Sequence, residues 1–245
     1  MKNKILLKIT LLSSFLSPGA QAYNPFRHVG AGLRDLGDEQ NLITLGVGSA
    51  LTFVALGIDQ SLARHYEDHN PWGGISKLGN DYLGTGIPGA VVGLSTLLYG
   101  AMAKKDHEIH SGQAHLEALA MSGLLTGLLK FSFRRDRPDG GHASSFPSGH
   151  TSTTFTSAMV LHEMYDSVWL DIVTFSLASY TGACRVTARR HYLSDVLFGA
   201  TLGVIVGHAF AKHHKEGAQA QDSAVAWMPY FDSRESFGIM ASKSF

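Results

Sequence analysis

Long apolar segments constrain the fold of this 245-residue chain more than any other feature. They are rich in Ala, Leu and Gly, and polar turns interrupt them. None shows the strict alternation of apolar and polar residues that marks a half-buried strand. The pattern therefore predicts an all-α fold built as a helical bundle. The expected helices lie near residues 40–66, 74–81, 86–104, 112–132, 149–164, 167–184 and 191–213.

The N-terminal 22 residues have the form of a secretory signal peptide. Two lysines precede a mostly apolar run from Ile5 to Leu16, and Ala20-Gln21-Ala22 has the small-x-small form of a cleavage site. An N-terminal membrane anchor is the alternative, and Lys8 is unusual inside such a run. We expect residues 1–22 to be a signal peptide and the chain to be exported to the periplasm or cell envelope.

The remainder is expected to form one domain, residues 23–215, followed by a linker and C-terminal tail, residues 216–245. The polar stretch Lys212–Asp222 predicts the linker. Beyond it, Ala224–Phe231 and Ser236–Ser242 predict a short β-hairpin. Its aromatic residues suit either a membrane-contacting element or a strand pair that covers the core. The formal net charge of zero argues against a nucleic-acid partner, and a single cysteine excludes an intramolecular disulfide.

Membrane insertion depends on the length of the uncharged segments. Residues 41–58 and 82–103 reach the length needed to cross a bilayer. Residues 118–129 and 172–184 are too short by that standard, and residues 196–211 are borderline. With two good candidates, we favour an exported domain that contacts the membrane over a protein with many spans.

Three short motifs lie in one order within residues 130–195. In each, cationic, histidine or hydroxyl residues recur at a fixed spacing. They read Lys130-x6-Arg137-Pro138, Pro147-Ser148-Gly149-His150 and Arg185-x5-His191-x3-Asp195.

The motifs contain the groups that bind a phosphate ester. Lys130, Arg137 and Arg185 supply cations for the phosphate oxygens. Ser148 offers a hydroxyl, and Gly149 lets a backbone N–H approach the anion closely. If a helix begins at Gly149, its N-terminus adds partial positive charge.

The two motif histidines suit phosphoryl transfer. His191 and Asp195 are four residues apart, so on a helix the carboxylate can accept a hydrogen bond from one imidazole nitrogen. The other nitrogen is then free to attack phosphorus, and His150 is left for proton transfer. Because the cations can neutralise the phosphate, neither a metal nor another cofactor is required.

At these residues the sequence resembles the type 2 phosphatidic acid phosphatases (PAP2). These share their fold with bacterial class A acid phosphatases and vanadium-dependent haloperoxidases. The resemblance covers mainly residues 115–210, and one departure is Cys184 at a position where the family usually has Ser. It implies a catalytic set and a phosphate-binding set: His191 as the nucleophile that forms a phosphohistidine, Asp195 as its orienting partner, His150 as general acid and base, and Lys130, Arg137, Ser148, Gly149 and Arg185 as phosphate ligands.

The function we expect is metal-independent hydrolysis of a phosphomonoester or pyrophosphate by a PAP2-type phosphatase. The substrate would be a lipid phosphate or another phosphorylated molecule of the cell envelope. Two alternatives stay open. One is a vanadate-dependent haloperoxidase, because vanadate mimics the phosphoryl transition state; the other is a non-catalytic protein that binds an anion or a lipid in the envelope.

Two further groups of side chains give weaker signals. Four arginines flank the motifs and either widen the positive potential or are simply solvated, and we do not prefer the functional reading. They are Arg134, Arg135, Arg189 and Arg190. Three histidines, His107, His110 and His115, have spacings that could recruit a metal, but no carboxylate or cysteine pattern completes a site.

Overall fold

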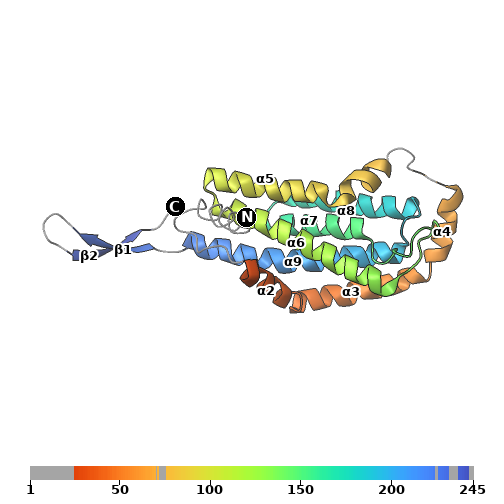
Figure 1. Cartoon of the computed structure of the whole chain (residues 1–245), viewed down its shortest axis with the longest axis horizontal. Coiled ribbons are helices and arrows are strands. Elements are labelled where there is room, and N and C mark those ends of the chain that lie inside the picture. The colour runs from red at the N-terminus through yellow and green to blue at the C-terminus, as the bar shows by residue number, and fades with distance from the viewer. Residues whose placement is uncertain (1–24, 70, 72–75, 224–225, 232–236, 243–245) are drawn as a thin grey trace, which may run out of the picture.

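The computed structural model describes residues 25–69, 71, 76–223, 226–231 and 237–242, so the expected signal peptide lies outside the described residues. The described chain is a helical bundle whose long helices run along the long axis of the molecule, which confirms the all-α prediction (Figure 1). The elements are α2 (Pro25–Asp35), α3 (Glu39–Leu56), α4 (Asp59–Asp68), the π-helical turn η2 (Leu78–Tyr82), the 3₁₀ turn η3 (Leu83–Thr85), α5 (Ile87–Ala103), α6 (Asp106–Phe133), α7 (Gly149–Met164), α8 (Val168–Thr187) and α9 (Leu193–Ser223).

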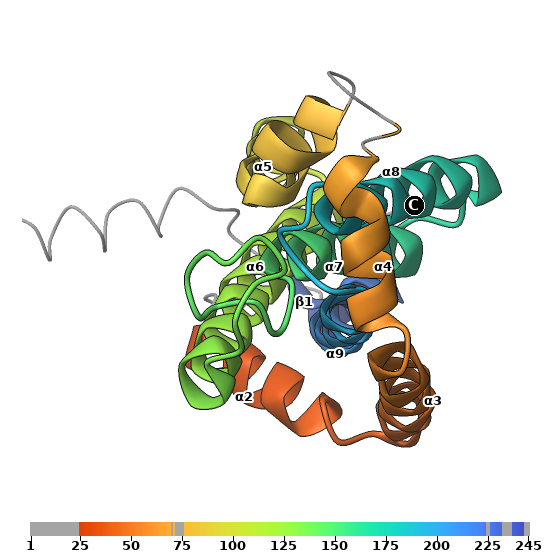
Figure 2. The same cartoon turned by 90° about the vertical axis from the view of Figure 1, so that its right-hand side faces the viewer.

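The first long helix expected from the sequence, residues 40–66, is in fact two helices. It bends by 60° between α3 and α4. The carboxylate of Asp59, the first residue of α4, accepts hydrogen bonds from the backbone N–H of Ser194 at 3.0 Å and from its hydroxyl at 2.5 Å. These bonds hold α4 across one end of the bundle, as the end view shows (Figure 2). A second bend, of 40°, separates η2 and η3 from α5.

Helix α9 packs closely against α7 because two glycines of α9 lie at the contact. A Cβ on Gly203 would lie 2.4 Å from the carbonyl oxygen of Ser152, and one on Gly207 would lie 2.7 Å from the Cβ of Met159. No side chain larger than hydrogen fits there without a shift of the helices. The buried core lies where α6, α7 and α9 meet and contains Ala114, Ala118, Val160, Met164, Leu202, Val206, Ala209, Phe210 and Ala211.

The C-terminal region differs in part from the expectation. Residues 212–222, expected as a linker, continue α9 as a helix to Ser223. Polar contacts tie the start of this stretch to the bundle: Lys212 Nζ lies 3.0 Å from Asp38 Oδ2, and His214 Nε2 lies 3.0 Å from Glu117 Oε2. Beyond α9, strands β1 (Ala226–Phe231) and β2 (Phe237–Ser242) pair antiparallel, which confirms the hairpin.

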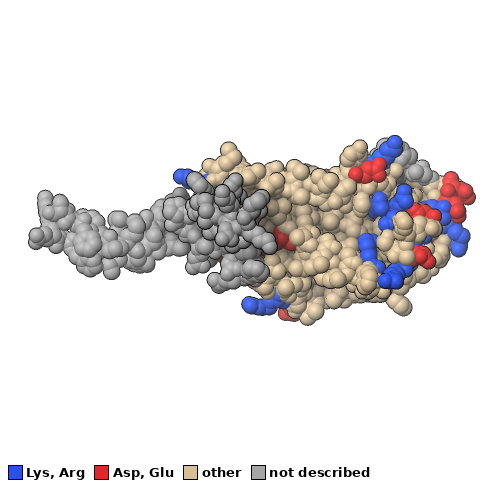
Figure 3. Space-filling view, viewed as in Figure 1, with Lys and Arg blue, Asp and Glu red and all other residues tan. Residues whose placement is uncertain are grey.

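Apolar side chains cover the outside of the bundle. We call this surface the apolar belt; it is made by exposed residues of α3, α5, α6 and α8, among them Phe53 (76% exposed), Val54, Val91, Met102 (86%), Phe131 and Trp169 (78%). Charged side chains gather at the end of the molecule where α4 lies, and the middle of the visible face is almost free of them (Figure 3). So large an exposed apolar surface indicates contact with lipid and supports membrane association.

Two described helices are long and apolar enough to cross a membrane, α6 and residues 193–216 of α9, and up to four spans result if each bent pair counts as one. The prediction that residues 118–129 are too short was wrong because α6 extends well beyond them on both sides. Its 28 residues correspond to about 42 Å at 1.5 Å per residue, which exceeds the roughly 30 Å of a bilayer's hydrocarbon core.

Candidate active site

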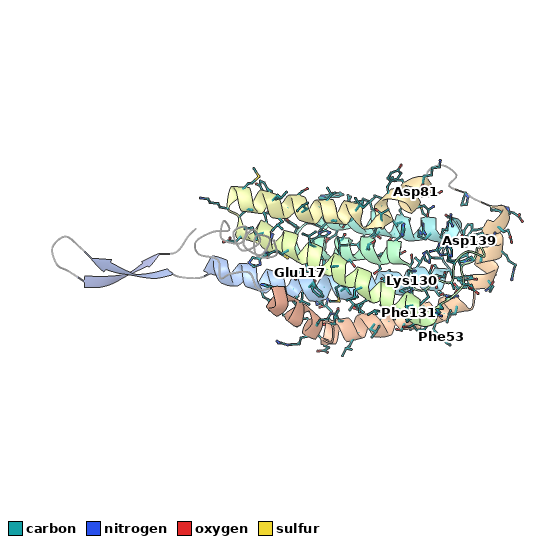
Figure 4. All side chains as sticks on the ribbon, in the orientation of Figure 1. Phe53, Asp81, Glu117, Lys130, Phe131 and Asp139 are labelled. Carbon is teal, nitrogen blue, oxygen red and sulfur yellow. The ribbon has the colours of Figure 1, made fainter. Side chains whose placement is uncertain are left out.

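The three motifs meet at the charged end of the bundle. Lys130 lies in the last turn of α6, Ser148 immediately precedes α7, and Arg185 lies in the last turn of α8. His191 lies in the turn before α9, and Asp195 lies in the first turn of that helix. Figure 4 shows Lys130 and Asp139 at this end, far from Glu117 along the bundle axis. Four helix ends therefore bring together residues that are up to 65 positions apart in the sequence.

His191 is held by a backbone carbonyl. Its Nδ1 lies 2.7 Å from the oxygen of Ser145, and its side chain is only 3% exposed. A carbonyl can only accept a hydrogen bond, so Nδ1 carries the proton and Nε2 keeps its lone pair. The expected direct partner, Asp195, lies 3.9 Å from Nδ1. The geometry differs from the expectation because His191 precedes the helix instead of lying on it.

Asp195 contacts His191 mainly through Ser145. Its Oδ2 accepts hydrogen bonds from the hydroxyl of Ser145 at 2.5 Å and from the backbone N–H of Tyr192 at 2.8 Å. Its Oδ1 accepts one from Arg135 at 2.6 Å. The buried carboxylate thus fixes the same residue whose carbonyl orients His191.

The surroundings of His191 keep its imidazole neutral. Burial, followed by the positive charges of Arg185, Lys130 and Arg137, lowers the pKa of His191 well below its usual value of 6.5. A neutral ring with a free Nε2 lone pair is the form that can act as a nucleophile.

Two arginines at the site have unused donors. Among the described residues, the buried Nε atoms of Arg137 and Arg185 have no hydrogen-bond partner. One terminal nitrogen of Arg185 donates to the side-chain oxygen of Asn80 at 3.1 Å. Lys130 Nζ donates to the carbonyl oxygen of Ser144 at 2.5 Å. Buried N–H groups without an acceptor are costly, and an anion bound between these arginines would satisfy them.

The middle motif forms the start of α7. The Ser148 side chain is buried, and its Oγ accepts a hydrogen bond from the hydroxyl of Thr151 at 2.9 Å. Gly149 is the first helical residue, and a Cβ there would lie 3.4 Å from Thr126 and 3.9 Å from Lys130. His150 packs against Gly84, where a Cβ would lie 2.4 Å from the imidazole. The motif therefore lies between Lys130 on one side and η3 on the other.

An apolar groove lies beside His150. It has a volume of about 120 Å³, and its walls come from η3, α5, α6, α7 and α8. Leu83 and Thr153 line the end nearest the motif, since Thr153 is three residues after His150 and its hydroxyl donates to the carbonyl of Gly84 at 3.1 Å. Val92 and Leu177 line the groove further along.

Sequence reasoning missed four residues that shape the site: Asp59, Asn80, Arg135 and Ser145. Arg135 was expected either to widen the positive potential or to be solvated, but its guanidinium binds two buried carboxylates. Asp59 comes from a distant helix, so no local motif marks it. Of the other flanking arginines, Arg134 is exposed and Arg190 pairs with Asp139 at 2.9 Å. Arg189 is half-buried; it pairs with Glu67 at 3.0 Å and donates to the carbonyl oxygen of Pro138 at 3.0 Å.

The three histidines considered for a metal contact different neighbours. His115 Nε2 lies 3.0 Å from the hydroxyl of Ser157, His110 Nδ1 lies 3.4 Å from His214 Nδ1, and the His107 ring packs edge-on against Tyr165. Within the part of the chain that the structure describes, no three His, Cys, Asp or Glu side chains converge to hold a metal ion.

Over the part of the chain that carries the three motifs, the sequence is similar to the PAP2 superfamily. The sequence model of that superfamily matches residues 113–217, which include all ten motif positions, and this confirms the resemblance seen in the motifs. A crystal structure titled as the first transmembrane PAP2 type phosphatidylglycerolphosphate phosphatase from Bacillus subtilis has the same fold. It covers 71% of this chain and 94% of its own, with a TM-score of 0.54 and 20% identity.

Similar curated proteins are named lipid A 1-phosphatases. The one from Porphyromonas gingivalis is 44% identical over 91 residues, which are 36% of this chain and 20% of that protein. The one from Rhizobium etli is 34% identical over 103 residues, which are 35% of this chain and 42% of that protein. The chain thus spans less than half the length of these relatives.

Proposed function

We propose that this chain is a metal-independent phosphatase of the cell envelope that removes phosphate from a membrane lipid through a phosphohistidine intermediate. The observation that supports it most is that the buried Nε–H groups of Arg137 and Arg185, beside a neutral His191, have no partner in the described part of the chain. They provide a place for a phosphate and a nucleophile to attack it.

The reaction would proceed in two displacements. Nε2 of His191 attacks phosphorus, so that a P–N bond forms while the bond from phosphorus to the lipid oxygen breaks. Burial and the charge of Arg185 lower the pKa of His150 to about 4, so His150 would first take up the proton of the phosphate monoanion as the substrate binds and then donate it to the leaving lipid alkoxide. A water molecule then attacks the phosphohistidine, gives its proton to His150, and breaks the P–N bond to release inorganic phosphate.

During both displacements the cations offset the charge on the equatorial phosphate oxygens. Lys130, Arg137 and Arg185 would supply that charge, with the backbone N–H of Gly149 at the start of α7 as a further donor. The carbonyl of Ser145 keeps the His191 proton on Nδ1 throughout, so the attacking atom does not change.

A lipid substrate fits the surroundings of the site. The apolar groove begins one helical turn from His150, so a phosphate at the arginines and an acyl chain in the groove can belong to one molecule. The apolar belt would hold the bundle among lipids as a protein with several spans, with the site at one edge of the bilayer. Since curated relatives are named lipid A 1-phosphatases, lipid A is the first substrate to test.

The test is phosphate release by the purified protein in detergent. The substrates are lipid A, phosphatidylglycerol phosphate and a soluble aryl phosphate, offered without added metal and with a chelator. We expect release from a lipid, and loss of release in His191→Ala. His142→Ala is the matched control because His142 is exposed in the loop before α7. Unchanged turnover by His191→Ala, or no turnover of any substrate by the wild type, would overturn the proposal.

A further inference from the structure

We infer that Asp59 and Arg135 form a positioning clamp for the nucleophile, and that Arg135 is not a phosphate ligand. This inference rests on the proposed function. The clamp joins the bend between α3 and α4 to the start of α9, and it acts on His191 through Asp195 and Ser145.

Arg135 is a bridge between two buried carboxylates. One terminal nitrogen lies 2.6 Å from Asp195 Oδ1, and the other lies 2.8 Å from Asp59 Oδ2. The carboxylates are 0% and 2% exposed, whereas the guanidinium is 25% exposed. Arg135 is the one side chain that ion-pairs with both carboxylates among the described residues, so each depends on it for charge compensation.

The clamp is also fixed at its other contacts. The nitrogen that binds Asp195 also donates to the hydroxyl of Ser194 at 2.7 Å, and this hydroxyl donates to Asp59 at 2.5 Å. The guanidinium lies over the ring of Tyr192, with its carbon 4.2 Å from the ring centroid. Planar, two-sided contacts of this kind fit a guanidinium and not the ammonium of lysine.

A continuous set of contacts leads from the clamp to the nucleophile. Arg135 holds Asp195, Asp195 accepts the hydroxyl of Ser145, and the carbonyl of Ser145 accepts the Nδ1 proton of His191. Lys130, Arg137 and Arg185 are the cations whose charges lower the pKa of His191, whereas both terminal nitrogens of Arg135 are bound by Asp195, Ser194 and Asp59. The clamp therefore sets the orientation of His191, and the other cations bind the phosphate.

Loss of the clamp should change catalysis without changing phosphate binding. We would measure kcat and KM with a soluble aryl phosphate, and the inhibition constant of inorganic phosphate, for Arg135→Gln, Arg135→Lys and Asp59→Asn. Arg135→Gln should lower kcat by about tenfold to a hundredfold, because a misoriented nucleophile attacks less often. The inhibition constant should stay within about twofold. The kcat of Arg135→Lys should lie between that of the wild type and that of Arg135→Gln.

The two halves of the clamp should be coupled. Arg135→Gln leaves two uncompensated carboxylates, whereas Arg135→Gln combined with Asp59→Asn leaves one, so the double variant should lose less kcat than the product of the single losses. Arg134→Gln and Asp68→Asn are the matched controls, because both side chains are exposed on the same two elements. They should keep the wild-type kcat.

Three results would overturn the inference: a kcat of Arg135→Gln within twofold of the wild type, weaker phosphate inhibition in step with kcat, or strictly multiplicative losses in the double variant. If Arg135→Gln does not elute as a folded protein, Arg135→Lys and Asp59→Asn decide by the same criteria. Absence of turnover in the wild type and in Arg134→Gln would instead mean that the proposed function fails, and the inference with it.

Discussion

The Nδ1 atom of His191 donates its hydrogen bond to the backbone carbonyl of Ser145, 2.7 Å away, and not to the carboxylate of Asp195. A backbone carbonyl only accepts and does not titrate, so this contact keeps the proton on Nδ1 whenever the imidazole is neutral. Asp195 contributes by holding Ser145 in place. The reactivity of the imidazole is thereby separated from the ionisation of the carboxylate.

Replacement of Arg185 should weaken phosphate binding. Arg185→Gln removes a charge and the buried Nε–H that would contact the phosphate. A hydrogen bond to a charged group contributes about 1.5–3 kcal/mol, so the inhibition constant of phosphate should rise by roughly tenfold to a hundredfold. Arg190→Gln is the control, because Arg190 pairs with Asp139 at the surface. Equal inhibition constants in the two variants would contradict the assignment.

The stability of the protein should fall on acidification because of His191. Its pKa is lowered in the folded state, so below about pH 6.5 the unfolded chain takes up a proton that the folded chain does not. Stability from this residue is therefore present above that value and is lost as the pH falls below it, by at most about 1.4 kcal/mol per pH unit. Thermal unfolding of the wild type and of His191→Gln, each at about pH 7 and pH 5, measures this loss. Between the two pH values the variant should lose less stability than the wild type.

Filling the apolar groove should impair lipid hydrolysis selectively. Val92→Trp places a large ring on the wall of the groove and should raise KM for a long-chain lipid phosphate severalfold, while turnover of an aryl phosphate stays near the wild type. Val91→Trp is the matched control, since Val91 is an exposed neighbour on α5 that does not line the groove. The KM for the lipid phosphate should rise in Val92→Trp and stay near the wild-type value in Val91→Trp.

The close contact of α7 and α9 should tolerate no added volume. Gly203→Ala would put a methyl group 2.4 Å from the carbonyl oxygen of Ser152, and overpacking of this kind costs about 1–3 kcal/mol. Gly123→Ala on α6 is the control, because a Cβ there meets nothing within 4 Å. Thermal unfolding in detergent should show a lower melting temperature for the first variant, and no decrease for the second.

Much of the molecule could be predicted from local patterns. The apolar segments predict the helices of the bundle, and the spacing within three motifs predicts which residues share a functional end, because local spacing survives folding. What the sequence did not predict depends on contacts between distant segments. The bend that places Asp59 against Ser194, the inward course of Arg135 and the carbonyl of Ser145 beside His191 all belong to this class.

The extent of helices was also hard to predict. The hydropathy of residues 118–129 indicated a short segment, but α6 runs from Asp106 to Phe133 because its polar first half packs within the bundle, where His115 meets Ser157. Similarly, the polar end of α9 stays helical past Lys212, which pairs with Asp38. Composition alone cannot separate a solvated linker from a helix whose polar residues find partners.

The four helix ends that carry the motifs all lie at the same end of the bundle, the end where α4 lies (Figure 1). A protein held in a bilayer by the apolar belt would present its arginines to the headgroups of one leaflet only. Lipids in the opposite leaflet would have to flip before their phosphate could be cleaved, so the composition of the two leaflets would diverge wherever the enzyme works faster than lipids cross.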